Sequence, residues 1–206
     1  MADLPLRLGI LASGRGSNFA AILDAIDAGR CPAEVAILVS DRPDAEALER
    51  AAAHAIPTAV VVPTDYPDRE KYDLQVVERL RAAKVQLVAL AGYMRIVTPA
   101  FLAAFPDRVI NIHPALLPAF PGLHAQRQAL EYGVKVSGCT VHFVDEGVDS
   151  GPIILQQAVE VCDDDTEESL SARILVEEHK LYPEAIRRIA RGEVALGGRR
   201  PRQEVA

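Results

Sequence analysis

Residues 6–18 read LRLGILASGRGSN, and this segment carries the clearest indication of the fold class. The apolar run at 6–12 stops at Ser13, and a short apolar run bounded by turn residues predicts a buried β-strand. Beyond the loop, apolar residues recur at helical spacing, at Phe19, Ile22, Leu23 and Ile26. Ser17 or Asn18 is expected to cap this helix. A strand, a glycine-containing loop and a helix in this order predict the first unit of an α/β protein.

The alternation of strand and helix continues to residue 112. Apolar runs predict further strands at 35–39, 58–62, 86–91 and 109–112. Helical patterns lie between them, at 44–55, 68–83 and 99–104. Leu74, Val77 and Leu80 are expected on the buried face of the 68–83 helix. Continuous apolar strands separated by helices predict a mostly parallel central sheet with helices on both faces.

The pattern changes after His113. Three prolines lie in 113–122, and they exclude a regular helix or a central strand there. The elements expected beyond this segment are one helix and two strands, at 125–132, 137–144 and 153–161. A loop at 145–151 joins the two strands, which we expect to form an antiparallel C-terminal part of the sheet.

A long final helix is expected to start at Thr166, and Pro183 should kink or interrupt it. The tail at 196–206 is rich in glycine, arginine and proline, and we expect it to be disordered. No internal repeat or linker divides the chain, so residues 1–195 are predicted to form a single domain.

Composition and charge exclude several classes of protein. The 206 residues are 50% hydrophobic and 25% charged, which suits a globular protein with a real core. Lys and Arg number 22 and Asp and Glu 29, and the resulting net charge of −7 argues against nucleic-acid binding. The sequence has no signal-peptide pattern and no apolar run of about 18 residues, so we expect a cytoplasmic protein that does not bind membranes.

The three cysteines are Cys31, Cys139 and Cys162, and none of them forms a C-x-x-C pair. No histidine motif has the spacing of a zinc site. We therefore expect three buried thiols and no metal.

The loop from Ser13 to Asn18 is a candidate anion site. Its two glycines let the backbone approach a ligand, and the N–H groups and dipole of the following helix favour an anion. The dinucleotide-binding pattern needs a small residue three positions after Gly16, where this chain has Phe19. The ending of a P-loop, Gly-Lys-Ser/Thr, is also absent. A single phosphate monoester remains as the expected ligand, and the alternative is a tight turn that binds nothing.

Asn111-Ile112-His113 ends the last strand of the parallel pattern. Residues two apart on a strand face the same side, so the carboxamide and the imidazole leave the sheet together. Asn111 can donate to a developing oxyanion, and His113 can exchange a proton near neutral pH. Asp149 would favour the imidazolium of His113 if its loop lies beside this strand.

These groups suit direct acyl transfer to an amine, because no Gly-x-Ser-x-Gly nucleophile motif accompanies them. The alternative is a pair of polar residues without function at a strand end.

Four segments carry a resemblance to a known family, namely LASGRGSN at 11–18, AGYMRI at 91–96, NIHPALLPAFPG at 111–122 and DSGPII at 149–154. From Leu8 to about Arg191 the chain resembles the glycinamide ribonucleotide formyltransferases. The resemblance implies a single-domain, Rossmann-like formyltransferase fold. It also implies transfer of a formyl group from the co-substrate 10-formyltetrahydrofolate to the amine of glycinamide ribonucleotide (GAR), in de novo purine biosynthesis.

The same resemblance implies roles for particular residues. The catalytic residues would be Asn111, His113 and Asp149. The residues that bind GAR would be Gly14, Arg15, Gly16, Ser17, Asn18 and Glu178. The folate pocket would be formed by Arg69, Tyr93, Met94, Arg95, Ile96, Val97, Asn111, Val144, Asp145, Glu146 and Asp149. The expected partners are these two small molecules, without metal or nucleic acid, and the protein would be a monomer or a weak homodimer.

Other activities remain open at this point. Enzymes that hydrolyse formyltetrahydrofolate or formylate methionyl-tRNA resemble the same core, but they carry a further N-terminal or C-terminal domain that we do not expect here. An NAD(P)-binding oxidoreductase would use Asp41 to bind a ribose, and Phe19 argues against it. A non-catalytic nucleotide-binding module would leave Asn111, His113 and Asp149 unexplained.

Overall fold

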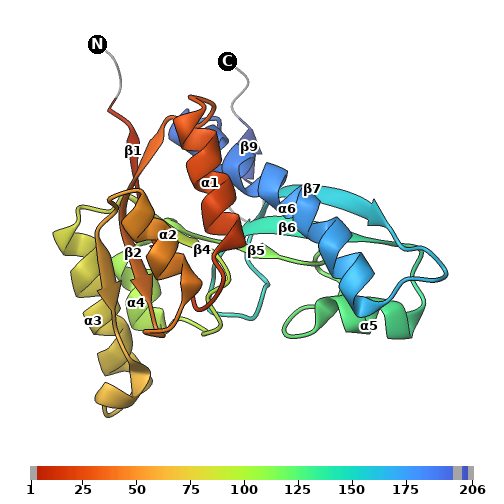
Figure 1. The fold of residues 1–206 in the computed structure, drawn as a ribbon, viewed down its shortest axis with the longest axis horizontal. Coiled ribbons are helices and arrows are strands. Elements are labelled where there is room, and N and C mark those ends of the chain that lie inside the picture. The colour runs from red at the N-terminus through yellow and green to blue at the C-terminus, as the bar shows by residue number, and fades with distance from the viewer. Residues whose placement is uncertain (1–3, 197–200, 204–206) are drawn as a thin grey trace. The chain divides into compact units, whose positions relative to one another are not determined.

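The computed structural model describes residues 4–196 and 201–203 (Figure 1). They form two compact units, which meet in the chain between Ile110 and Asn111. Strand β5 (Val109–His113) contains this boundary. The single domain expected for residues 1–195 stays a prediction.

The first unit contains a parallel sheet. Its strands are β1 (Leu6–Leu11), β2 (Ala33–Ser40), β3 (Thr58–Val60) and β4 (Leu87–Leu90), in the order β3-β2-β1-β4. β1 pairs with β2 and with β4, β2 pairs with β3, and every pair is parallel. β1 is buried from Leu8 onward and β4 throughout, which explains their continuous apolar sequences.

Helices connect these strands. They are α1 (Ser17–Asp27), α2 (Glu46–Ala53), α3 (Arg69–Ala82) and α4 (Pro99–Ala104), with a 3₁₀ turn η1 (Pro63–Asp65) before α3. α1 contacts α2, and α3 packs against α4 (Figure 1). The predicted alternation of strand and helix is therefore confirmed in this unit.

Two details of the first unit differ from the prediction. Gly16, in the left-handed conformation with a φ of 68°, is the N-cap of α1, and no side chain caps the helix. The predicted cap by Ser17 or Asn18 is wrong because the helix already begins at Ser17. Leu74 is 40% exposed, because the buried face of α3 runs through Tyr72, Asp73, Val76, Val77 and Leu80 instead.

The second unit contains an antiparallel pair of strands covered by a helix. β6 (Val136–Phe143) and β7 (Ile153–Glu160) pair antiparallel, as predicted. Helix α5 (Ala125–Tyr132) precedes them, and the long helix α6 (Glu167–Ala190) lies along both strands (Figure 1). Buried side chains join α6 to the strands, among them Cys139, Val159, Leu170 and Ile174. The predicted α/β class with an antiparallel C-terminal part is confirmed.

Helix α6 begins directly after Thr166, where the sequence predicted its start, and it contains Pro183. Thr166 forms a capping box with Ser169, in which each side-chain hydroxyl accepts from the backbone N–H of the other residue. Pro183 does not interrupt the helix, which continues for 24 residues. Proline lacks the helical N–H donor and its ring crowds the carbonyl four residues earlier, but burial of Tyr182, Pro183 and Ile186 stabilises the continuous helix.

Part of the predicted disordered tail is described. Leu196 ends β8 (Val194–Leu196), which pairs antiparallel with β9 (Pro201–Gln203). Residues 197–200 and 204–206, on which the rest of that prediction falls, lie outside the described part.

The cysteines differ in exposure. Cys31 and Cys139 are buried as predicted, and burial raises the pKa of the Cys139 thiol to about 12. Cys162 is exposed, so the prediction was wrong for this residue, which follows the end of β7. Among residues 4–196 and 201–203, no helix is long and apolar enough to cross a membrane.

Candidate active site

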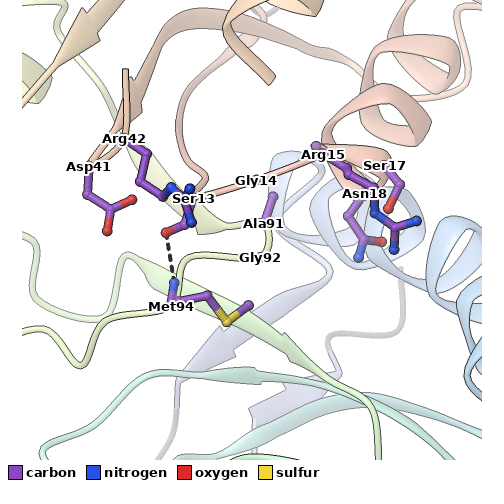
Figure 2. A pocket seen from close by; sticks show the side chains of 11 residues that line it. Ser13, Gly14, Arg15, Ser17, Asn18, Asp41, Arg42, Ala91, Gly92 and Met94 are labelled. Carbon is purple, nitrogen blue, oxygen red and sulfur yellow. Dashed lines mark hydrogen bonds between the residues drawn. The ribbon is translucent and has the colours of Figure 1, made fainter. Parts of the chain in front are cut away.

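The predicted anion loop lines a cavity in the first unit. The cavity has a volume of about 520 Å³, within the usual range for a small-molecule site. The residues that line the cavity follow the carboxyl ends of β1, β2 and β4, where an open α/β sheet usually binds ligands. Gly16 is one of the eleven residues that line it, and Figure 2 labels the other ten: Ser13, Gly14, Arg15, Ser17, Asn18, Asp41, Arg42, Ala91, Gly92 and Met94.

Helix α2 holds the glycine loop in place. Ala47 N donates to Gly14 O over 3.1 Å, and Arg50 Nε donates to Arg15 O over 2.9 Å. Gly16 combines its φ of 68° with close packing, because a Cβ added there would lie 2.8 Å from the Cβ of Ala47. Glycine is therefore required at position 16 for both its backbone conformation and its lack of a side chain.

We expect Gly16→Ala to weaken binding of a phosphorylated ligand at least about tenfold, because the left-handed strain of ~1–2 kcal/mol adds to the clash. Titration calorimetry with ribose 5-phosphate measures this affinity. Gly29→Ala is the matched control, since Gly29 has the same φ of 68° but open space where a Cβ would lie. That variant should lose stability and keep its affinity. Unchanged affinity in Gly16→Ala would show that this loop does not bind the phosphate.

The segment predicted to bind folate reaches the same cavity. Ser13 Oγ accepts from Met94 N over 2.9 Å (Figure 2), and Ser13 N donates to Gly92 O over 3.0 Å. The side chains of Met94 and Ile96 are 69% and 57% exposed, whereas Tyr93 and Val97 are buried. The glycine loop and Met94 therefore lie together in the first unit.

The predicted catalytic residues lie together in the second unit. His113 Nδ1 lies 3.2 Å from Asp149 Oδ2, and Asn111 Nδ2 lies 3.4 Å from Asp149 Oδ1. The side chains of His113 and Asp149 are only 5% and 13% exposed, so water screens their interaction weakly. The aspartate loop folds back to the strand end, which places a carboxylate against the imidazole.

The backbone around Asp149 fixes the position of its carboxylate. Asp149 has a φ of 50°, an uncommon conformation that aspartate tolerates better than most residues. Gly122 N donates to Asp149 Oδ2 over 2.8 Å, which ties the proline-rich segment to the aspartate loop. A Cβ at Gly151 would lie 1.8 Å from Phe143 O, so this loop closes tightly after Asp149.

The protonation of the cluster follows from its neighbours. Burial lowers the pKa of His113 below its ordinary value, although Asp149 and the Phe120 carbonyl act to raise it. Burial would raise the pKa of Asp149, but contacts with His142, Gly122 N and His113 hold it below its ordinary value. His113 Nε2 lies 2.8 Å from Phe120 O, so both ring nitrogens face an acceptor. The ring satisfies both contacts only as an imidazolium.

His142 is a member of this cluster that the sequence analysis missed. Its Nε2 lies 3.3 Å from Asn111 Nδ2 and 3.5 Å from Asp149 Oδ1. Its Nδ1 lies 2.9 Å from Phe143 O and donates to this carbonyl, so Nε2 is directed at Asn111 and Asp149. The available signal was an imidazole in a buried strand, next to the aspartate loop.

The other predicted site residues of the second unit occupy varied positions. Asp145 Oδ1 accepts from Gly147 N and Ser150 Oγ, so this carboxylate organises the aspartate loop. Val144 is half-buried and Glu146 is exposed. Glu178 is buried on α6 with 7% exposure. Within the described residues, no group of three or more His, Cys, Asp or Glu side chains could hold a metal ion.

Residues 6–186 match the formyl transferase family, and the chain belongs to this family. It shares 47% identity over 188 residues with the trifunctional purine biosynthetic protein adenosine-3 of Drosophila pseudoobscura pseudoobscura. That match covers 90% of this chain but only 14% of the relative's length. Phosphoribosylglycinamide formyltransferase of Bacillus subtilis is 46% identical over 193 residues, which cover 92% of this chain and 99% of that protein.

A solved structure agrees over nearly the whole chain. The glycinamide ribonucleotide transformylase 1 of Symbiobacterium toebii is 56% identical to it. The two structures superpose with a TM-score of 0.96, over 98% of this chain and 95% of the other. This agreement bears out the resemblance on which the sequence analysis relied.

Proposed function

We propose that the protein transfers the formyl group of 10-formyltetrahydrofolate to the amine of GAR, giving formyl-GAR and tetrahydrofolate in de novo purine biosynthesis. The observation that carries the proposal is the buried cluster of Asn111, His113 and Asp149, with 3.2 Å between imidazole and carboxylate. It supplies an amide donor, a proton donor and a carboxylate, the groups that acyl transfer to an amine requires.

The amine nitrogen of GAR attacks the formyl carbon, and a tetrahedral oxyanion forms. The amide nitrogen of Asn111 now faces His142 and Asp149, and we infer that one of its N–H groups turns to the oxyanion during the reaction. Protonated His113 donates to the same oxyanion, where electrostatic stabilisation acts most strongly. His113 Nε2 now faces Phe120 O, so we infer that the formyl oxygen replaces this carbonyl as its acceptor. Asp149 opposes the effect of burial on the pKa of His113 and so favours the protonated ring, and it relays the amine proton, through water, towards N10 of the folate. The bond between the formyl carbon and N10 then breaks, and tetrahydrofolate leaves.

The glycine loop would bind the phosphate of GAR. Backbone N–H groups at the start of α1 have no capping side chain, so they can donate to a phosphate. Ser17 and Asn18 add polar side chains on the wall of the cavity. Glu178 would accept from the ribose hydroxyls, and residues 93–97 would contact the folate. Phe19 is completely buried where a dinucleotide site needs a small residue, which argues against an NAD(P) site.

An absorbance assay with 10-formyl-5,8-dideazafolate, run with and without GAR, tests the proposal. Release of the deformylated folate only when GAR is present would support transfer to this acceptor. Equal release without GAR would identify a hydrolase, and no release would contradict formyl chemistry altogether. The cytoplasmic location and the monomeric or weakly dimeric state stay predictions.

A further inference from the structure

The segment 93–98 of the first unit presents apolar side chains outward without regular secondary structure. It follows β4 and leads into α4, whose first residue is Pro99. Met94 and Ile96 are 69% and 57% exposed, while Tyr93 and Val97 face inward. An irregular segment that exposes apolar side chains needs contacts on its inner side to keep one conformation.

One face of α3 supplies three such contacts. Arg69 Nη2 donates to Ile96 O over 2.6 Å, and the hydroxyls of Tyr72 and Tyr93 lie 2.5 Å apart. The carboxylate of Asp73 accepts from Thr98 N over 2.6 Å. Arg69, Tyr72 and Asp73 are spaced three and four residues apart, so they project from one side of the helix. We call Arg69, Tyr72 and Asp73 the α3 clamp.

Asp73 is the member of the α3 clamp that depends most on its hydrogen bond. It is only 4% exposed, and a buried carboxylate is costly unless it accepts hydrogen bonds. The hydrogen bond from Thr98 N to Asp73 also holds the residue at which α4 begins. Thr98 is the N-cap of that helix, because its Oγ1 accepts from Phe101 N. Asp73 therefore fixes the end of segment 93–98, and Arg69 fixes its middle.

Tyr72 adds a second kind of contact. Its ring lies 4.7 Å from the guanidinium carbon of Arg95, a cation–π arrangement. Its hydroxyl and that of Tyr93 are buried together, and burial raises the pKa of Tyr72 to about 12. Both hydroxyls therefore stay protonated and can keep their hydrogen bond throughout the working pH range.

We propose that the α3 clamp positions segment 93–98 to bind the folate, and that Asp73 and Tyr72 set its affinity without touching either substrate. This inference rests on the proposed function, because the segment's ligand is the folate co-substrate. Arg69 then acts through Ile96 O rather than as a direct ligand of the folate. The α3 clamp should govern KM for the formylfolate, while kcat and the affinity for the phosphorylated substrate change little.

Asp73→Ala tests the proposal, with Asp73→Asn as the conservative variant. In Asp73→Ala we expect KM for 10-formyl-5,8-dideazafolate to rise about 10- to 100-fold, because Thr98 N loses a charged acceptor. Asp73→Asn keeps an acceptor oxygen and should recover most of this loss. Glu70→Ala is the matched control, because Glu70 is an exposed acid on the same helix.

Calorimetry with the dideazafolate distinguishes a failure of the α3 clamp proposal from a failure of the proposed function. Wild-type protein that binds no dideazafolate would refute the proposed function itself. Wild-type protein that binds it, with equal affinity in Asp73→Ala, would refute the α3 clamp alone. A parallel fall in kcat and in ribose 5-phosphate affinity would also overturn the proposal, since it would indicate general damage. If Asp73→Ala does not fold, Tyr72→Phe provides the test. This variant loses one hydroxyl contact, so we expect its KM for the folate to rise about threefold or more. An unchanged KM in Tyr72→Phe would overturn the α3 clamp proposal.

Discussion

Asp149→Asn is expected to lower kcat by about 100-fold or more, the usual contribution of acid–base groups, while the fold stays intact. The neutral amide no longer stabilises the imidazolium of His113, and it accepts no proton from the attacking amine. Its remaining oxygen can still accept from Gly122 N, which donates to Asp149 Oδ2 over 2.8 Å. Circular dichroism and the kcat of the purified variant measure the two parts of this prediction.

The pH dependence of the same variant has a definite sign. The charge of Asp149 acts to raise the pKa of His113, so its removal lowers that pKa further below the ordinary value. Protonated His113 then persists only at lower pH, and the alkaline limb of the residual activity should move to lower pH. NMR titration of the His113 ring follows this shift directly.

The stability of the fold should also depend on pH through the charge of Asp149. The pKa of Asp149 is lowered in the folded protein, so its ionised form stabilises the fold above the ordinary carboxyl pKa, near 4. This contribution is lost as pH falls through the folded-state pKa. The difference in melting temperature between wild type and Asp149→Asn should therefore shrink below about pH 4.

The control for the effect of Asp149→Asn on kcat is Asp163→Asn, because Asp163 is an exposed carboxylate of the same unit. Near-normal turnover in Asp149→Asn would refute the catalytic assignment.

Asn111→Ala is expected to lower kcat by about 10²- to 10³-fold, the usual effect of removing one oxyanion donor. Because the oxyanion exists only during the reaction, KM for both substrates should change little. Gln157→Ala is the control, since it removes an exposed amide from β7 of the same unit. Steady-state kinetics on both variants provide the comparison. A rise in KM with unchanged kcat would mean that Asn111 binds substrate rather than stabilising the transition state.

The sequence predicted the elements best where local signals were strong. The helices expected at 99–104 and 125–132 have those bounds in the structure. In the first of them Thr98 caps the helix and Pro99 occupies its first position, a combination that marks a helix start. Strand ends differed by a residue or two in either direction, because pairing with neighbouring strands, and not the length of the apolar run, sets them.

The errors share a physical cause, which is that packing decided what local pattern could not. Leu74 lies at helical spacing from Val77, yet the face of α3 that becomes buried is set by the sheet and α4. Pro183 stays in a helix because its neighbours are buried, although its own chemistry disfavours it.

For the candidate site, the sequence indicated the residues of the motifs, but not the residues that contact them from other segments. Asn111 and His113 share a strand face, which periodicity shows, and the aspartate loop could be guessed to reach them. The role of His142 depends on which strand lies beside β5 and on the register of that pairing, and neither can be read from one sequence. The contacts of the α3 clamp likewise join segments about 25 residues apart in the chain, which only the folded structure brings together.

The most direct test of direct formyl transfer uses 10-formyl-5,8-dideazafolate labelled with ¹³C at the formyl carbon. The reaction with GAR is run in a large excess of unlabelled formate, and mass spectrometry measures the label in formyl-GAR. Direct attack of the GAR amine predicts that the product keeps the full ¹³C enrichment of the donor. Product diluted by unlabelled formyl groups, or labelled formate formed without formyl-GAR, would refute direct transfer.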